Sequence, residues 1–375
     1  MNTIFKSINW MQGMSVSSSH FIATENYIME RLLKNTELLR GKYAYGLLPS
    51  NSEETPMQLS IVGKGDGTRL ALYSYQGITP GGFPIDLEAS DGSVSCACTD
   101  NGERADEGWD VVLSVAPFER RPCGEPDMKE VPPRYPFVEP VYRLSIIARD
   151  KNSVNQYGPF DVVVGLLRKK DGDFRLDGNY IPPSLAMSSS SDLSNYMISF
   201  SQIISSIKNA LDVILTKAYS QTANKSDILE NVVMICKELQ RTLAAMYFQW
   251  HNYGMSMSPY KVTEIISGLA NAILTSLTFM SKATKEEVLK YFYEWNGVSP
   301  SAFEQILDDV VSLEYNQNRI SLSMLSIDSM LKMLEELLVS LSRLDYVGQH
   351  KESMVISVSS TKDETNQGKK SSWLL

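Results

Sequence analysis

The hydrophobic period changes once and abruptly, around residues 180–183, and this change constrains the fold more than any other feature. Before it, in residues 55–180, short apolar runs alternate with Gly, Pro and Asp, as β-strands and turns do. After it, apolar residues recur every three or four positions over long segments, as in packed helices. We therefore expect one β-rich part followed by one helical part.

The first part predicts an antiparallel sheet. Its strand candidates are residues 57–62, 69–75, 109–116, 141–149 and 160–167. Apolar and polar residues alternate in the first two, which indicates half-buried strands, whereas Val162–Val164 form an unbroken apolar run typical of burial on both faces. No helical pattern long enough for a crossover separates these strands, so a sandwich or partial barrel is expected, with a helix at residues 18–39 before it.

Residues 117–140 contain seven prolines, at positions 117, 122, 126, 132, 133, 136 and 140. Proline cannot donate to a ladder, so we expect no regular strand pairing through most of this segment. Long loops of this kind are often functional. Two interpretations stay open, an irregular arm packed over the sheet and a partner-binding arm.

The helical part carries four heptad-spaced apolar rows. Helix starts are expected at Ser258–Pro259 and Ser299–Pro300, and Thr284 with Glu287 is expected to form a capping box. Its candidate seam positions, for a bundle or a trimer, are Ile204, Leu211, Leu239, Leu243, Ile327, Leu331, Leu334, Leu338 and Leu341. The last helix has further apolar residues at Met330, Met333, Leu337 and Leu344, which favours a bundle that also packs against copies of itself. We expect a β-rich domain at residues 1–188, a helical domain at 189–346 and a polar, disordered tail at 347–375.

Charge and composition exclude several classes of function. The 375 residues include 35 Lys and Arg against 44 Asp and Glu, a net charge of -9 that argues against nucleic-acid binding. Four cysteines indicate a reducing compartment rather than a disulfide framework. The least charged stretch, residues 265–281, is interrupted by polar residues and too short to span a bilayer, and the first thirty residues lack a signal peptide. We expect a cytoplasmic protein with no membrane insertion.

No catalytic constellation emerges from the motifs. The glycine-rich segment 63–67 lacks a Lys–Ser/Thr pair and precedes a strand, so a hairpin turn is the better interpretation. Cys96 and Cys98 lack the further ligands of a zinc site, and Cys236 lies in a heptad row. Only three histidines are present. We expect no enzyme, no metal and no cofactor.

Two local motifs carry a family resemblance. Residues 8–14, with Trp10, Gly13 and Met14, are followed by His20–Phe21 and an aromatic at Tyr27. Residues 176–183, ending in Tyr180, Ile181, Pro182 and Pro183, form the second motif. Together they resemble the TssK family, baseplate subunits of the bacterial type VI secretion system, over about residues 8–345.

That resemblance implies a β-rich shoulder, a helical neck and a C-terminal head. It implies a homotrimer whose shoulder binds the TssF–TssG wedge and which reaches an envelope-anchored complex, at the inner face of the inner membrane. Trp10, Gly13, Met14, His20 and Phe21 become candidates for wedge contact. For Trp10, Met14 and Phe21 we favour the alternative that they anchor the N-terminus in the shoulder core. Residues 180–183 are expected to form the shoulder–neck junction.

The sequence departs from the family pattern at its end. After about Tyr346 only 29 residues remain, which is too few for a head domain with its own core, so the envelope partner stays open. Trp373, Leu374 and Leu375 are a candidate docking segment, or they lie against the neck or stay idle. Two other functions remain as alternatives: a phage-tail-like receptor-binding protein or adhesin, and an enzyme with an inconspicuous site.

Overall fold

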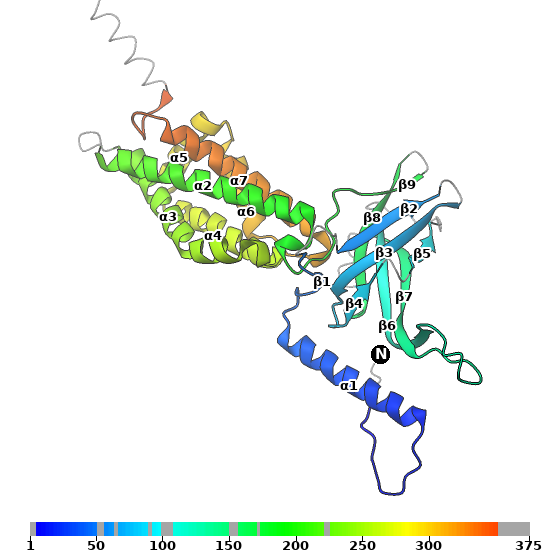
Figure 1. Ribbon diagram of the computed structural model, residues 1–375. Helices are drawn as coiled ribbons and strands as arrows, with labels where there is room; N and C mark the ends of the chain where they lie inside the picture. The colour runs from blue at the N-terminus through cyan, green and yellow to red at the C-terminus, as the bar shows by residue number, and fades with distance from the viewer. Residues whose placement is uncertain are drawn as a thin grey trace, which may run out of the picture. The chain divides into compact units, whose positions relative to one another are not determined.

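The computed structural model describes residues 5–50, 56–63, 67–88, 92–98, 108–149, 157–170, 173–220 and 226–351. The chain forms two compact units. The first comprises Met1–Ser194 together with Met255–Tyr260 and Tyr315–Ser321, and the second comprises Asn195–Gly254, Lys261–Glu314 and Leu322–Leu375. Helix α1 and strands β1–β9 belong to the first unit, and the long helices lie mainly in the second (Figure 1).

The first unit is an antiparallel β-sandwich preceded by one helix, as predicted. Its elements are α1 (Ser18–Leu39), β1 (Gly46–Leu47), β2 (Met57–Val62), β3 (Arg69–Ile78), β4 (Pro84–Leu87), β5 (Val94–Ala97), β6 (Trp109–Cys123), β7 (Phe137–Ala148), β8 (Asp161–Lys170) and β9 (Asp173–Leu176). Strand β3 pairs with β1, β2, β4 and β5 in one sheet, and the other sheet has the order β7-β6-β8-β9. Strands β2 and β3 pair antiparallel on either side of the glycine-rich segment, which confirms the hairpin.

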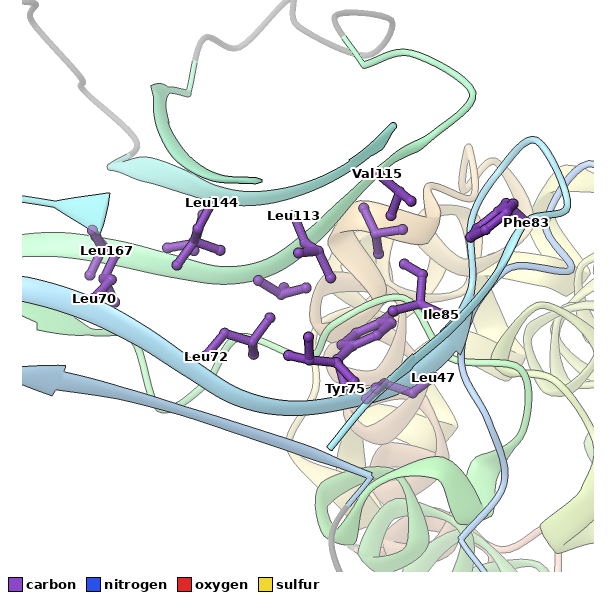
Figure 2. Close-up of a cluster of buried hydrophobic side chains, with 14 of the residues drawn as sticks. Leu47, Leu70, Leu72, Tyr75, Phe83, Ile85, Leu113, Val115, Leu144 and Leu167 are labelled. Atoms are coloured by element: carbon purple, nitrogen blue, oxygen red, sulfur yellow. The ribbon is translucent and has the colours of Figure 1, made fainter. Parts of the chain in front are cut away.

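The sandwich core comes from alternate residues of facing strands. Leu70 and Leu72 of β3 and Leu113 and Val115 of β6 are buried in one apolar cluster (Figure 2). Side chains two positions apart share one face of a strand, so this spacing directs each set into the space between the sheets. The run Val162–Val164 is buried throughout, as its sequence predicts.

Most of residues 117–140 lie outside regular strand pairing, as predicted, but both ends of the segment stay in the sheet. Strands β6 and β7 stay paired from Arg120–Pro140 to Cys123–Phe137, after a register shift that takes Pro117 out of the ladder. Strand β8 pairs with β6 only as far as Ser114. The extension is therefore a two-stranded ribbon with open edges. A proline on such an edge can point its nitrogen, which has no N–H to donate, away from the partner strand.

The second unit is built from long helices with two short ones between them. The helices, whose first residues in part belong to the first unit, are α2 (Ser191–Ser220), α3 (Asp227–Tyr253), α4 (Pro259–Thr278), α5 (Lys282–Asn296), α6 (Pro300–Val311) and α7 (Ile320–Ser342). Ser299 caps α6 ahead of Pro300, as predicted. A capping box at Thr284 was expected, but Ser281 caps α5 by accepting from the Thr284 N–H at 3.2 Å. Within the described residues, no helix combines the length and apolar character needed to cross a membrane.

The heptad rows form the core of a single chain. Eight of the nine predicted seam residues are buried, and the ninth, Ile204, is half-buried. Met330, Met333 and Leu337 are buried as well. The interpretation that these extra residues indicate self-association is therefore wrong, because α7 is covered on those sides by its own bundle.

Candidate functional site

Large apolar side chains remain exposed on two segments of the first unit. One is the N-terminal segment with α1; the other is the arm, residues 117–140, which contains the ribbon of β6 and β7 and its tip (Figure 1). We call the following exposed residues the α1–arm surface: Trp10, Met11, Val16, Phe21, Ile22, Ile28, Leu32, Leu38, Leu39, Met128, Val131, Tyr135, Phe137 and Val138. Patches of this kind mark interaction sites on soluble proteins.

Helix α1 has two apolar sides and buries only one. Phe21, Ile28, Leu32 and Leu39 follow spacings of seven, four and seven, which place them on one side of a helix with 3.6 residues per turn, and all four are exposed. Leu33 is the one fully buried residue of this helix, and it joins the sandwich core on another side. The outer stripe therefore has the spacing of a packing surface, yet each of its four side chains is at least 50% exposed.

The N-terminal motif packs against the start of α1 and not into the sandwich. The Trp10 ring lies 6.0 Å from the His20 ring, edge to face, and 6.3 Å from Phe21. The Ser17 N–H donates to His20 Nδ1 at 3.2 Å, which holds the imidazole at the helix start. Trp10 is 50% exposed and Phe21 58% exposed. The favoured interpretation, that these residues anchor the N-terminus in the core, is wrong for both.

The rest of the motif makes the turn before α1. Gly13 has φ +80°, a left-handed conformation that glycine adopts without strain, and the Met14 N–H donates to the Met11 carbonyl at 3.2 Å. Met14 is half-buried. The glycine and methionine of the motif thus position Trp10 over the helix.

Charged contacts join α1 to the base of the arm. Arg120 of β6 pairs with Glu25 at 2.7 Å and donates to Asn26 Oδ1 at 3.1 Å. Beside this contact, a groove of about 350 Å³ runs between α1 and the arm, with Ile28, Leu32 and Val138 in its lining. Ile28 and Leu32 of α1 and Val138 of the arm therefore line one groove.

The tip of the arm is organised by its own contacts. The Asp127 N–H donates to the Arg134 carbonyl at 2.9 Å, and Arg134 Nε pairs with Glu130 at 2.6 Å. That pairing lowers the pKa of Glu130 below its ordinary value. Val131 at the tip is 97% exposed. The arm thus presents apolar side chains on a defined turn.

The predicted junction residues lie inside the first unit. Ile181, Pro182 and Pro183 are buried and Tyr180 is half-buried. The Leu47 N–H donates to the Pro183 carbonyl at 2.8 Å. Gln317 Nε2 donates to the Ser184 carbonyl at 2.9 Å and to the Tyr45 carbonyl at 3.0 Å. Sequence reasoning missed Gln317, since nothing marks a single glutamine between two helices as a buried donor.

A buried ion pair was also missed. Arg149 Nη2 lies 2.6 Å from Asp110 Oδ1, with both side chains less than a tenth exposed. Tyr157 donates to Asp110 Oδ2 at 2.5 Å, and the Arg149 guanidinium lies over the Tyr180 ring. Burial and the bond to Asp110 raise the pKa of Tyr157. The alternating sequence around Asp110 in β6 was the available signal, because a carboxylate on a buried strand needs a partner.

Burial disfavours the reactive thiolate form of two of the four cysteines. Cys96, Cys98, Cys123 and Cys236 are free thiols. Burial raises the pKa of Cys96 to about 11 and that of Cys236 to about 12, which disfavours the thiolate. Within the described part of the chain, no group of three or more His, Cys, Asp or Glu side chains is placed to hold a metal ion.

The chain resembles known proteins in its three-dimensional structure and not in its sequence. No family model and no curated protein sequence matches the chain. A crystal structure of TssK superposes with a TM-score of 0.54, covering 88% of this chain and 69% of that one at 15% identity. The fold is that of TssK. TssK from the type VI secretion system of EAEC, in complex with nanobody nb18, superposes with a TM-score of 0.50, over 83% of this chain and 68% of that one at 13% identity.

The TssK-like fold confirms the predicted order of an antiparallel sandwich and a helical bundle. The candidate docking residues Trp373, Leu374 and Leu375 lie outside the described residues, so their role stays a prediction.

Proposed function

We propose that this protein is a structural component of a type VI secretion baseplate, with the α1–arm surface as its binding site for a TssF–TssG-like wedge. The observation that carries the proposal is the concentration of exposed apolar side chains on α1 and the arm of a TssK-like fold. The N-terminal motif that resembles the TssK family supplies part of this surface, through Trp10 and Phe21.

The proposed assembly is a homotrimeric adaptor. Residues 1–188 act as the wedge-binding shoulder, residues 189–346 as the trimerising neck, and an envelope subunit binds elsewhere on the chain. The adaptor works in the cytoplasm at the inner face of the inner membrane. Its role is binding rather than catalysis, because the large exposed apolar side chains that define the α1–arm surface can pack against a partner but supply no reacting group.

The α1–arm surface has the composition of an interface core. Burial of an exposed Leu, Ile or Phe side chain stabilises a complex by about 1.5 to 3 kcal/mol, and half-exposed side chains contribute a part of that. Trp and Tyr dominate the strongest interface positions, and here Trp10 and Tyr135 are both half-exposed. Several such residues together are sufficient for a specific complex.

The test is co-purification with TssF–TssG-like subunits from the same organism. Leu32→Asp places a charge in the centre of the α1 stripe, and we expect at least about a tenfold loss of affinity, equivalent to 1.4 kcal/mol. Val62→Asp is the matched control, since Val62 is similarly exposed on the same unit but outside the α1–arm surface. Equal binding by both variants would contradict the assignment of the surface.

A second variant separates the arm from α1. A short Gly-Ser turn replaces residues 124–136, so that the Cys123–Phe137 pair of the ribbon is kept. Weaker wedge binding with an unchanged melting temperature would implicate the tip of the arm. Full binding would restrict the contact to α1 and the N-terminal segment.

A further inference from the structure

The tip of the arm carries a proline-rich segment at residues 131–136, which reads Val-Pro-Pro-Arg-Tyr-Pro. Every residue of this segment is exposed, Val131 at 97% and Tyr135 at 50%. Phe137, which follows it and begins β7, is 68% exposed. A run of apolar side chains that the chain leaves open on a turn is a candidate contact surface.

The backbone of this segment is held in place before any partner binds. Proline fixes φ at about −65°, which applies at positions 132, 133 and 136, and Tyr135, which precedes a proline, is restricted to extended backbone. Between them, the Arg134 carbonyl accepts from the Asp127 N–H at 2.9 Å, and the Arg134 guanidinium donates to both carboxylate oxygens of Glu130, at 2.6 and 2.8 Å. The segment therefore has little conformational entropy to lose when it is bound.

The chemistry of the segment limits what can bind it. Its prolines have no N–H, so the backbone at 132, 133 and 136 offers carbonyl acceptors and no donors. A partner strand that adds to an edge needs both donors and acceptors along it, and this backbone does not supply them. The charge of Arg134 is compensated by Glu130, which leaves the proline rings and Tyr135 for apolar contact. A complementary surface must therefore combine flat apolar area with hydrogen-bond donors.

We propose that residues 131–136 are a proline-rich ligand for a groove lined by Trp and Tyr side chains on a TssF–TssG-like wedge subunit. This inference rests on the proposed function and names the chemistry of its partner at the arm. Trp and Tyr rings give apolar faces on which proline rings pack, and their N–H and O–H groups donate to carbonyls of the segment. Proline-rich segments are recognised in aromatic grooves because their backbone is ordered in advance.

The experiment measures the affinity of full-chain variants for purified TssF–TssG-like subunits by biolayer interferometry. Pro133→Ala and Pro136→Ala are each expected to weaken binding at least about fivefold, and the double variant more than either. Pro133→Val keeps apolar bulk but restores an N–H and frees φ, so it is expected to bind as weakly as Pro133→Ala. Pro159→Ala, at an exposed proline of the first unit outside the arm, is the matched control and should bind like the wild type. Melting temperatures should agree, because all these side chains are exposed.

Fluorine NMR of the partner tests the aromatic groove directly. The wedge subunits are labelled with fluorotryptophan and fluorotyrosine, so that only their rings are observed. At saturating concentrations of either chain, the wild type should shift at least one ring resonance that the Pro133→Ala/Pro136→Ala chain leaves at its free position. Such a resonance belongs to a ring that contacts the proline-rich segment.

The outcomes separate the two proposals. If Leu32→Asp weakens wedge binding while the proline variants bind like the wild type, the aromatic groove is overturned and the proposed function stands. The same holds if Pro133→Val binds like the wild type, or if no labelled ring distinguishes the wild type from the double variant. A wild-type chain that does not bind the wedge subunits overturns both proposals.

Discussion

Removal of the Asp110 charge is the sharpest test of what holds the first unit together. In the Asp110→Asn variant, Arg149 stays buried without a counter-ion, and the amide offers one acceptor where the carboxylate served both Arg149 and Tyr157. Arg149 Nη2 also donates to the Asn318 carbonyl at 3.3 Å, so the same guanidinium holds the segment Tyr315–Ser321. The perturbation therefore acts on strands and on this segment together.

The magnitude follows from burial. Breaking a buried pair by removing one partner costs about 3 to 5 kcal/mol, because the remaining charge is uncompensated. An exposed pair such as Arg121–Glu139, whose arginine is 67% exposed, contributes only about 0 to 1 kcal/mol. Glu139→Gln is thus the matched control for the same chemical change on the surface.

Urea unfolding followed by circular dichroism measures the difference. With a slope of about 2 kcal/mol per molar, Asp110→Asn should lower the midpoint of the first unit by about 1.5 to 2.5 M, and Glu139→Gln by less than about 0.5 M. The double variant Asp110→Leu/Arg149→Met should recover most of the loss, since apolar replacement of a buried pair is often neutral. Equal midpoints for Asp110→Asn and Glu139→Gln would refute the reasoning.

Three further predictions concern backbone space, pH and the helical core. Gly46→Ala should destabilise the first unit by more than about 3 kcal/mol, because its Cβ would lie 2.1 Å from the Pro183 carbonyl at φ +113°; an unchanged melting temperature would contradict this. Burial raises the pKa of Tyr291 to about 12, so its contribution to the free energy of unfolding is complete below pH 10 and is lost as the pH rises from about 10 to about 12. The urea midpoint of the wild type should fall across this range, and that of Tyr291→Phe should fall less. Leu334→Asp, at a buried position, should cost the helical unit several kcal/mol, whereas Leu325→Asp, at a half-exposed one, should leave the helical melting transition unchanged.

Local patterns predicted most elements because they depend on neighbours in the sequence. Helix α1 has the predicted bounds, Ser18–Leu39, and β2 has the predicted bounds, Met57–Val62. Ser299 and Pro300 start α6 as predicted, since capping involves groups within one turn. The cap of α5 was expected at Thr284, but it lies three residues earlier, at Ser281, whose side-chain oxygen accepts from the Thr284 N–H.

The sequence did not predict in the same way which apolar side chains are exposed. Trp10 and Phe21 were expected in the core, and they lie on the surface because the N-terminal segment folds over α1. The extra apolar residues of α7 were expected at an interface, and Met330 and Leu337 lie in the bundle's own core. An apolar residue in a sequence indicates that some surface covers it, but the sequence does not say whether that surface belongs to the same chain.

The sequence by itself determined the change from strands to helices near Tyr180. It also determined the heptad rows of the long helices and where some of those helices begin, because hydrophobic period and capping are properties of adjacent residues. Only the tertiary structure decided which apolar faces stay open, that Asp110 meets Arg149 across 39 positions, and that Gln317 reaches carbonyls more than 130 positions away. Those contacts depend on how the sheets and connecting segments pack, and packing is set by the shapes of all the neighbours at once rather than by any local pattern.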